Sequence, residues 1–158
     1  MGCCPGSWSQ YCLRKVGPRG DVIGVDQSGG VPISAPNFRY IQRDILTLDP
    51  SRLLDKIPLR DVVLSDLAPQ TTGIRVTDES RSVELARKAL SVALVVGRRG
   101  GHFLCKVFEG PAVAAFKKDL SGTFRQVRTS RPSAVRKHSR EVYLVGLGKK
   151  EGEFDPSG

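Results

Sequence analysis

Charged side chains that could bind or activate a substrate stand at the ends of strand-like runs in this sequence. Asp26, Asp44 and Asp66 each close or follow a short run rich in β-branched or aromatic residues, and Lys106 lies inside another such run. In open α/β sheets, ligands bind beyond the carboxyl ends of the strands, so residues distant in sequence can meet there. Lys106 is the most informative of the four, because burying an ammonium without a partner is costly.

The opening stretch has the composition of a glycine-rich turn that holds a nucleotide. Gly6 is followed by helix-forming residues from Ser7 to Val16, so backbone N–H groups at the start of that helix could face an anion. Asp26 comes 20 residues after Gly6, the separation at which an acid accepts hydrogen bonds from ribose hydroxyls. The Gly-x-Gly-x-x-Gly fingerprint is absent, which disfavours a dinucleotide and its pyrophosphate.

Strand-like and helical runs alternate along the chain, which favours an α/β domain with a mostly parallel sheet and helices on both faces. The expected strands are 21–26, 38–42, 61–65, 101–107, 124–129 and 141–147. The expected helices are 7–16, 80–96 and 112–120, with Asp78 as a cap and Gly97 as a stop for the second. We predict one domain over residues 1–148 and a flexible tail over 149–158.

Composition and charge narrow the class of protein. The 158 residues, 39% hydrophobic and 26% charged, are typical of one globular domain, and no apolar run is long enough to span a bilayer. We therefore expect a cytoplasmic protein without a membrane partner. The net charge of +9 is concentrated between Lys117 and Lys150, where ten lysines and arginines face only two acids. Such a cluster is typical of a surface that binds a polyphosphate such as RNA, although basic runs can also be merely solvated.

The four cysteines do not form a metal-binding pattern. Cys3, Cys4, Cys12 and Cys105 contain no Cys-x-x-Cys pair, and only His102 and His138 could complete a tetrahedral site. We expect free thiols and no metal.

Four stretches, in order, together resemble one known family. They are Gly2-Cys-Cys-Pro-Gly-Ser-Trp-Ser-Gln10, Ser65-Asp-Leu-Ala-Pro69, Gly101-His-Phe-Leu-Cys-Lys-Val-Phe-Glu-Gly110 and the run from Arg131 to Tyr143. The chain resembles the FtsJ-type (RrmJ-like) RNA ribose 2'-O-methyltransferases from Gly2 to about Gly148. The resemblance implies a Rossmann-like class I methyltransferase fold. It also implies S-adenosylmethionine as methyl donor and a uridine of large-subunit ribosomal RNA as target, methylated by a monomer.

The resemblance also implies a role for individual residues. Lys106, Asp66 and Glu141 fall on the last three positions of the family's Lys-Asp-Lys-Glu catalytic tetrad. The implied donor-binding residues are Gly6, Trp8, Asp26, Asp44 and Asp66. The implied RNA-binding residues are Arg131, Arg136, Lys137 and Arg140.

A ribose 2'-hydroxyl is a poor nucleophile, so a base that removes its proton would assist methyl transfer. Lys106 is the candidate base. A lysine acts as a base when burial or a nearby cation lowers its pKa, whereas Asp66 and Glu141 would raise it. We therefore expect the two acids chiefly to orient Lys106 and the ribose, with much of the acceleration coming from alignment of the reacting atoms.

The sequence departs from the family at its beginning. The family's first strand and the preceding helix, which carries the first tetrad lysine, are missing, so we expect poor stability and little activity from the chain as given. Two alternative functions stay open. The chain could methylate a transfer RNA or an mRNA cap, or it could be a catalytically silent RNA-binding module; a dehydrogenase is a distant further possibility.

Overall fold

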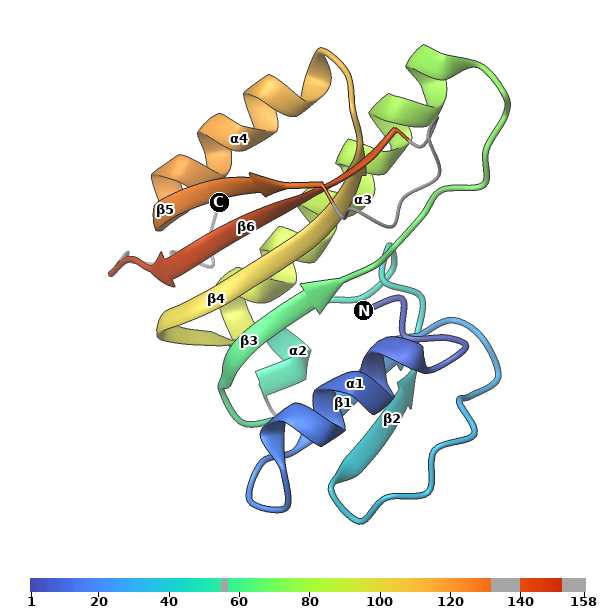
Figure 1. Ribbon diagram of the computed structural model, residues 1–158, viewed down its shortest axis with the longest axis vertical. Helices are drawn as coiled ribbons and strands as arrows, with labels where there is room; N and C mark the ends of the chain where they lie inside the picture. The colour runs from blue at the N-terminus through green and yellow to red at the C-terminus, as the bar shows by residue number, and fades with distance from the viewer. Residues whose placement is uncertain (55–56, 132–139, 152–158) are drawn as a thin grey trace. The chain divides into compact units, whose positions relative to one another are not determined.

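The computed structural model describes residues 1–54, 57–131 and 140–151. The chain divides into two compact units, Met1–Leu48 and Asp49–Gly158, and each is described by itself (Figure 1). The single domain expected over residues 1–148 stays a prediction. No helix of the described part is long and apolar enough to cross a bilayer.

The N-terminal unit contains one helix and a two-stranded parallel sheet. Helix α1 covers Ser7–Val16, as predicted, and strands β1 (Val22–Asp26) and β2 (Phe38–Gln42) pair in register from Val22↔Phe38 to Asp26↔Gln42. The turn between α1 and β1 is fixed by Asn37, whose side-chain amide donates to the carbonyls of Gly17 (3.0 Å) and Gly20 (2.8 Å). The start of β1 is thereby held close to the start of β2.

The opening residues of the chain lie along β1. The amide of Gly2 donates to the carbonyl of Val25 at 3.0 Å. Gly24 makes room for this segment, because a Cβ at that position would lie 2.9 Å from Sγ of Cys3. Within the described residues β1 pairs with β2 and with no other strand. The expectation that the family's first strand is missing from this sequence stays a prediction.

The described residues of the C-terminal unit form a four-stranded sheet and three helices. In chain order its elements are α2 (Ser51–Leu54), β3 (Arg60–Ser65), α3 (Arg75–Val96), β4 (Gly97–Phe108), α4 (Ala112–Thr123), β5 (Phe124–Ser130) and β6 (Glu141–Lys149). The strand order is β3-β4-β6-β5, so the last strand lies between β4 and β5 (Figure 1).

Strands β3, β4 and β5 run in the same direction, as the alternation of elements predicted, and β6 is the exception. β3 and β4 are parallel, but β6 runs antiparallel to both β4 and β5. Only residues 131–140 separate β5 from β6, and a parallel crossover needs roughly a dozen residues or more. The short connection therefore explains why β6 reverses direction.

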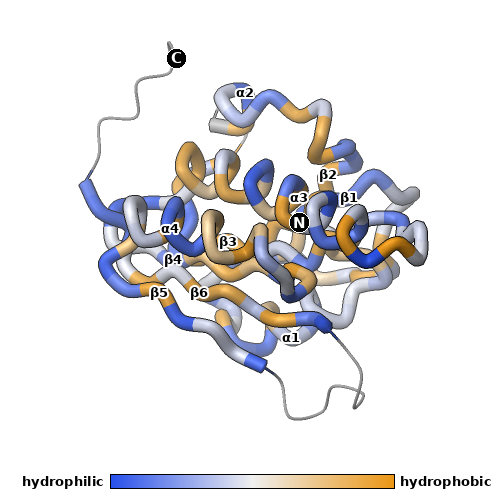
Figure 2. Tube along the Cα trace, turned by 90° about the horizontal axis from the view of Figure 1, so that it is seen from above, coloured by the Kyte–Doolittle hydropathy of each residue, from blue (hydrophilic) through white to orange (hydrophobic). Residues whose placement is uncertain are grey.

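The core of this unit lies between the sheet and helices α3 and α4, where apolar segments of strands and helices face one another (Figure 2). Phe103, Cys105 and Val107 alternate along β4 and are buried almost completely, as are Phe116 and Leu120 of α4. Side chains of a strand alternate between the two faces, so Lys106 points to the face opposite Cys105 and Val107. That face is only partly covered, as the intermediate burial of Leu104, Lys106 and Phe108 shows.

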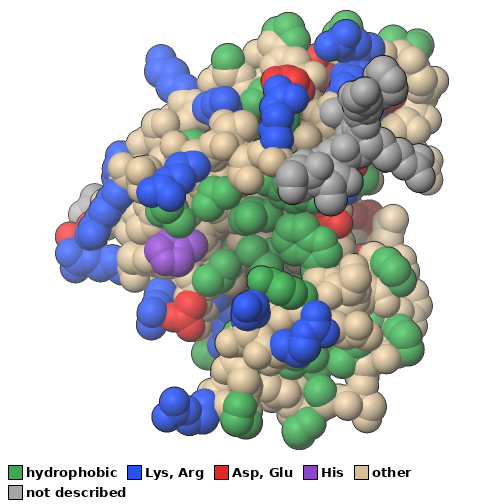
Figure 3. Space-filling view, viewed as in Figure 1, with side chains coloured by type: hydrophobic (Ala, Val, Ile, Leu, Met, Phe, Trp, Pro, Cys, Tyr) green, Lys and Arg blue, Asp and Glu red, His purple; other side chains and the backbone are tan. Residues whose placement is uncertain are grey.

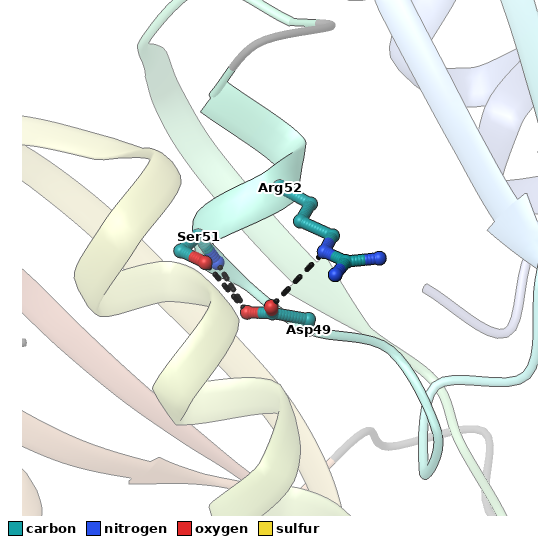
Figure 4. A network of polar contacts seen from close by, with 3 residues as sticks. All are labelled: Asp49, Ser51 and Arg52. Carbon is teal, nitrogen blue, oxygen red and sulfur yellow. Dashed lines mark hydrogen bonds and ion pairs between the residues drawn. The ribbon is translucent and has the colours of Figure 1, made fainter.

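Several boundaries differ from the sequence prediction; β4 begins at Gly97 rather than at residue 101, and α4 ends at Thr123 rather than at residue 120. α3 begins at Arg75 rather than at residue 80, so Asp78 lies within its first turn instead of capping it. α2 was not predicted; Asp49 accepts from the amide and hydroxyl of Ser51 and pairs with Arg52 at its start (Figure 4). β6 extends to Lys149, whose amine donates to the carbonyl of Gly97 at 2.8 Å, so the expected tail does not begin there.

Candidate active site

Three neighbouring strands bring the predicted catalytic residues together. Ser65, the last residue of β3, pairs with Cys105, so Asp66 lies level with Lys106 on β4. Lys106 pairs across β4 and β6 with Tyr143, and Glu141 lies two residues before Tyr143 on the same face. The sheet register thus places all of these side chains on one face.

The three charged groups form one cluster. The Nζ atom of Lys106 lies 3.0 Å from Oδ1 of Asp66 and 3.6 Å from Oε1 of Glu141. The side chain of Lys106 is 10% exposed, and those of Asp66 and Glu141 are 25% and 36% exposed. The cluster is therefore open to solvent mainly through its carboxylates, and the ammonium is held between them.

The protonation state of Lys106 follows from this arrangement. Burial lowers the pKa of the Lys106 amine, but the hydrogen bond and charge of Asp66 and the charge of Glu141 outweigh burial, and the net shift is upward. Lys106 is therefore an ammonium at neutral pH. The sequence analysis anticipated that the nearby acids Asp66 and Glu141 would raise the pKa of Lys106.

Tyr143 is a further residue of this cluster, and the sequence analysis gave it no role. Its hydroxyl hydrogen-bonds Asp66, and burial together with the charge of Asp66 raises the pKa of Tyr143. The signal was present in the sequence, because Tyr143 follows Glu141 at the two-residue spacing that keeps both on one face of a strand.

Buried polar side chains of α3 hold the loops that follow β3 and β4. Asp78 accepts from the amide (2.7 Å) and hydroxyl (2.8 Å) of Thr72, in the loop after Asp66. Glu79 accepts from the amide of Ala112 at 2.7 Å, and the hydroxyl of Ser82 accepts from the amide of Phe108 at 2.9 Å. The backbone on both sides of the charged cluster is thereby fixed to one helix.

The predicted donor-binding residues lie in the N-terminal unit, apart from Asp66. Asp26 ends β1, and its carboxylate accepts from the amides of Cys4 and Ser28, each at 3.0 Å. Burial raises the pKa of Asp26, but these backbone hydrogen bonds outweigh it and the net pKa is lowered. Gly6 precedes α1 with φ of +122°, a conformation that favours glycine. The opening loop and Asp26 are therefore one hydrogen-bonded substructure.

Asp44 and Trp8 are less closely tied to that substructure. Oδ1 of Asp44 accepts from the amide of Leu46 at 2.9 Å and so stabilises its own turn. Trp8 is half-buried in the first turn of α1. The donor-binding roles of both residues stay predictions.

Known proteins are similar to this chain over nearly its whole length. Residues 1–149 match the FtsJ-like methyltransferase family. The chain belongs to this family. The ribosomal RNA large subunit methyltransferase E of Bdellovibrio bacteriovorus is 41% identical over 153 residues, covering 95% of this chain and 78% of that protein. The protein of the same name from Desulfatibacillum aliphaticivorans is 43% identical, covering 96% and 73%.

Solved structures agree with this assignment. A ribosomal RNA methyltransferase, putative, from Plasmodium falciparum superposes with a TM-score of 0.81 at 27% identity, covering 96% of this chain and 85% of that one. Human methyltransferase-like protein 13 in complex with SAH gives a TM-score of 0.59 at 12% identity, over 95% and 70% of the two chains, and indicates the fold alone. The predicted Rossmann-like methyltransferase fold is confirmed.

Two of the arginines predicted to bind RNA in this FtsJ-like methyltransferase make contacts within the protein. Arg131 is exposed and pairs with Glu109. Arg140 is half-buried, and its Nη2 donates to the carbonyl of Arg75 at 3.3 Å. Arg136 and Lys137 lie outside the described residues.

Three side chains of the N-terminal unit lie close enough together to ligate a metal ion, although the sequence analysis predicted none. The ligand atoms of Cys3, Cys4 and Asp26 all lie within 4.8 Å of one another. Burial raises the pKa of the Cys3 thiol to about 11, which disfavours the thiolate that a metal would require. The absence of a metal stays a prediction.

Proposed function

We propose that this FtsJ-like methyltransferase transfers the methyl group of S-adenosylmethionine to a ribose 2'-hydroxyl of large-subunit ribosomal RNA. The observation that carries the proposal is the cluster of Asp66, Lys106 and Glu141, formed by three adjacent strands in a chain of this family. The finer prediction is that the target is a uridine and that the enzyme acts as a monomer in the cytoplasm.

The residues of the N-terminal unit fit the donor. Asp26 is kept ionised by two backbone amides, and each carboxylate oxygen retains a lone pair that a ribose hydroxyl could use. Gly6 lets the opening loop turn into α1, where further amides are available. When bound, the donor supplies an electrophilic methyl on a sulfonium. Asp44, Trp8 and Asp66 complete the proposed donor-binding set.

The charged cluster would handle the proton of the acceptor. As the 2'-oxygen bonds to the methyl carbon, the carbon–sulfur bond breaks and the hydroxyl proton must leave. Lys106 can accept that proton only in its neutral form, which is the minor form because Asp66 and Glu141 stabilise the ammonium. We assign Asp66 and Glu141 the role of fixing Lys106 and the sugar, and Lys106 the role of base.

The rRNA substrate is supported by relatives of this chain. The relatives from Bdellovibrio bacteriovorus and Desulfatibacillum aliphaticivorans are both ribosomal RNA large subunit methyltransferases, and the alignments cover nearly all of this chain. The basic C-terminal half is suited to the phosphates of RNA.

The test is transfer of a labelled methyl from S-adenosylmethionine to large ribosomal subunits that lack the modification. We expect an alkali-resistant ribose at one uridine, and loss of transfer in Lys106→Ala. Between roughly pH 7 and pH 9 the rate should rise about tenfold per pH unit, since the neutral amine is the active form. A flat profile would exclude Lys106 as the base.

The alternatives give different results in the same assay. Methyl transfer to transfer RNA or to a capped mRNA, with none to ribosomal subunits, would identify that RNA as the substrate instead. RNA binding without transfer to any of these substrates would leave a silent RNA-binding module.

A further inference from the structure

The start of α3 presents apolar side chains to solvent. Ile74 and Val76 are 63% and 71% exposed, and Arg75 between them is also exposed. We call residues 72–78 the α3 platform. Hydrophobic and basic side chains lie next to one another over this end of the helix (Figure 3).

The platform is held rigidly. Besides the two bonds from Thr72, the amide of Gly73 donates to Asp78 at 3.2 Å, and the amide of Ile74 donates to the hydroxyl of Thr72 at 3.2 Å. The amide of Asp78 donates to the carbonyl of Ile74 at 3.0 Å. Asp78 itself is 5% exposed. A network centred on a buried carboxylate thus fixes the backbone that carries the exposed side chains of Ile74 and Val76.

The platform is connected to the catalytic cluster. Arg140, which donates to the carbonyl of Arg75, is the residue directly before Glu141. The carboxylate of Glu141 lies 3.6 Å from Nζ of Lys106. On its N-terminal side, the platform follows Asp66 along the same loop. The platform is therefore linked to Glu141 through the hydrogen bond from Arg140, and to Asp66 along the chain.

We propose that Ile74 and Val76 form a subsite that packs against a nucleobase of the substrate RNA, a proposal that rests on the proposed function. A preformed apolar surface favours the flat face of a base, which loses unfavourable contact with water when it is covered. The guanidinium of Arg75 can contact the adjacent phosphate or stack on the next base. Arg75 and Arg140 place positive charge beside these apolar side chains, which favours the polyanionic substrate RNA over a neutral apolar partner.

A comparison of two labelled oligomers tests the subsite. One probe is a single-stranded 12-mer of uridine, and the other is a 12-mer of the same sugar-phosphate backbone without bases. We expect Ile74→Ser/Val76→Ser to weaken binding of the uridine oligomer about tenfold, the effect of roughly two methylene groups leaving a buried contact, and to leave the abasic oligomer unchanged. Arg75→Ala should weaken both.

The control variant is Leu59→Ser. Leu59 is 55% exposed but precedes β3, at the end of that strand remote from Asp66, and its replacement should change neither affinity. Equal weakening of both oligomers by the double variant, or none, would overturn the subsite. Because binding is measured without methyl transfer, an inactive enzyme with the expected base-dependent binding would contradict the proposed function and leave the subsite standing.

Discussion

Replacing Lys106 by methionine should destabilise the protein in a pH-dependent way, because the side chain lies between two carboxylates. At an effective dielectric constant of about 20, each of the ion pairs at 3.0 and 3.6 Å is worth about 5 kcal/mol before desolvation. Removing one partner from a buried pair typically costs about 3–5 kcal/mol. The partial exposure of Asp66 and Glu141 allows water to screen them, so we expect a loss of about 2 kcal/mol.

The way in which the free energy of unfolding changes with pH distinguishes the loss of ion pairs from a simple loss of packing. In the wild type the pKa of Lys106 is raised above 10.5, so the contribution of the cluster is fully present below that pH and is lost as the pH rises through the folded-state value. In Lys106→Met this contribution is absent at every pH. The deficit in stability relative to wild type should therefore be largest below pH 10.5 and should narrow as the pH rises above that value.

Urea unfolding followed by circular dichroism measures both effects. The matched control is the triple variant Asp66→Asn/Lys106→Met/Glu141→Gln, which removes all three charges and should be more stable than Lys106→Met alone at pH 7. A Lys106→Met variant as stable as wild type at pH 7, or one whose deficit does not narrow above pH 10.5, would refute the coupled cluster.

Other variants test neighbouring features. Tyr143→Phe removes the hydroxyl that bonds Asp66 and should slow methyl transfer severalfold with unchanged unfolding in urea; full activity would show that the hydroxyl is dispensable. Leu144→Ala should cost about 2–5 kcal/mol in urea unfolding, because Leu144 is completely buried. Asp26→Asn should weaken donor binding in calorimetry by at least about tenfold, which is roughly one lost charged hydrogen bond, and unaltered affinity would remove Asp26 from the donor site. Glu79→Gln should lower stability by about 1–2 kcal/mol, since the amide of Ala112 keeps only a neutral acceptor.

The strands were predictable because their apolar runs are short and end at distinct signals. β2 was predicted with its observed bounds, and β1 and β3 within one residue. The carboxyl ends of β3 and β4 then brought Asp66 and Lys106 together, as the rule for open sheets predicts. The direction of β6 was not predicted, because no pattern within a strand records which way its neighbour runs.

The start of α3 shows where local patterns mislead. Asp78 was expected to cap the helix, since aspartate before an apolar run is a common cap. In the structure Asp78 lies in the first turn of α3 and accepts from the amides of Thr72 and Gly73, six and five residues earlier in the chain. Contacts of this kind depend on the path of the preceding loop, which hydrophobic periodicity does not describe. The α3 platform was missed for the same reason.

The strand order β3-β4-β6-β5 determines when the charged cluster is completed as the chain is synthesised. β5 leaves the ribosome before β6 but can join the sheet only after β6 has inserted beside β4 (Figure 1). Glu141 and Tyr143 arrive with that last strand. Before β6 pairs with β4, Asp66 and Lys106 can meet without Glu141 and Tyr143, so the cluster is completed only by the insertion of this strand.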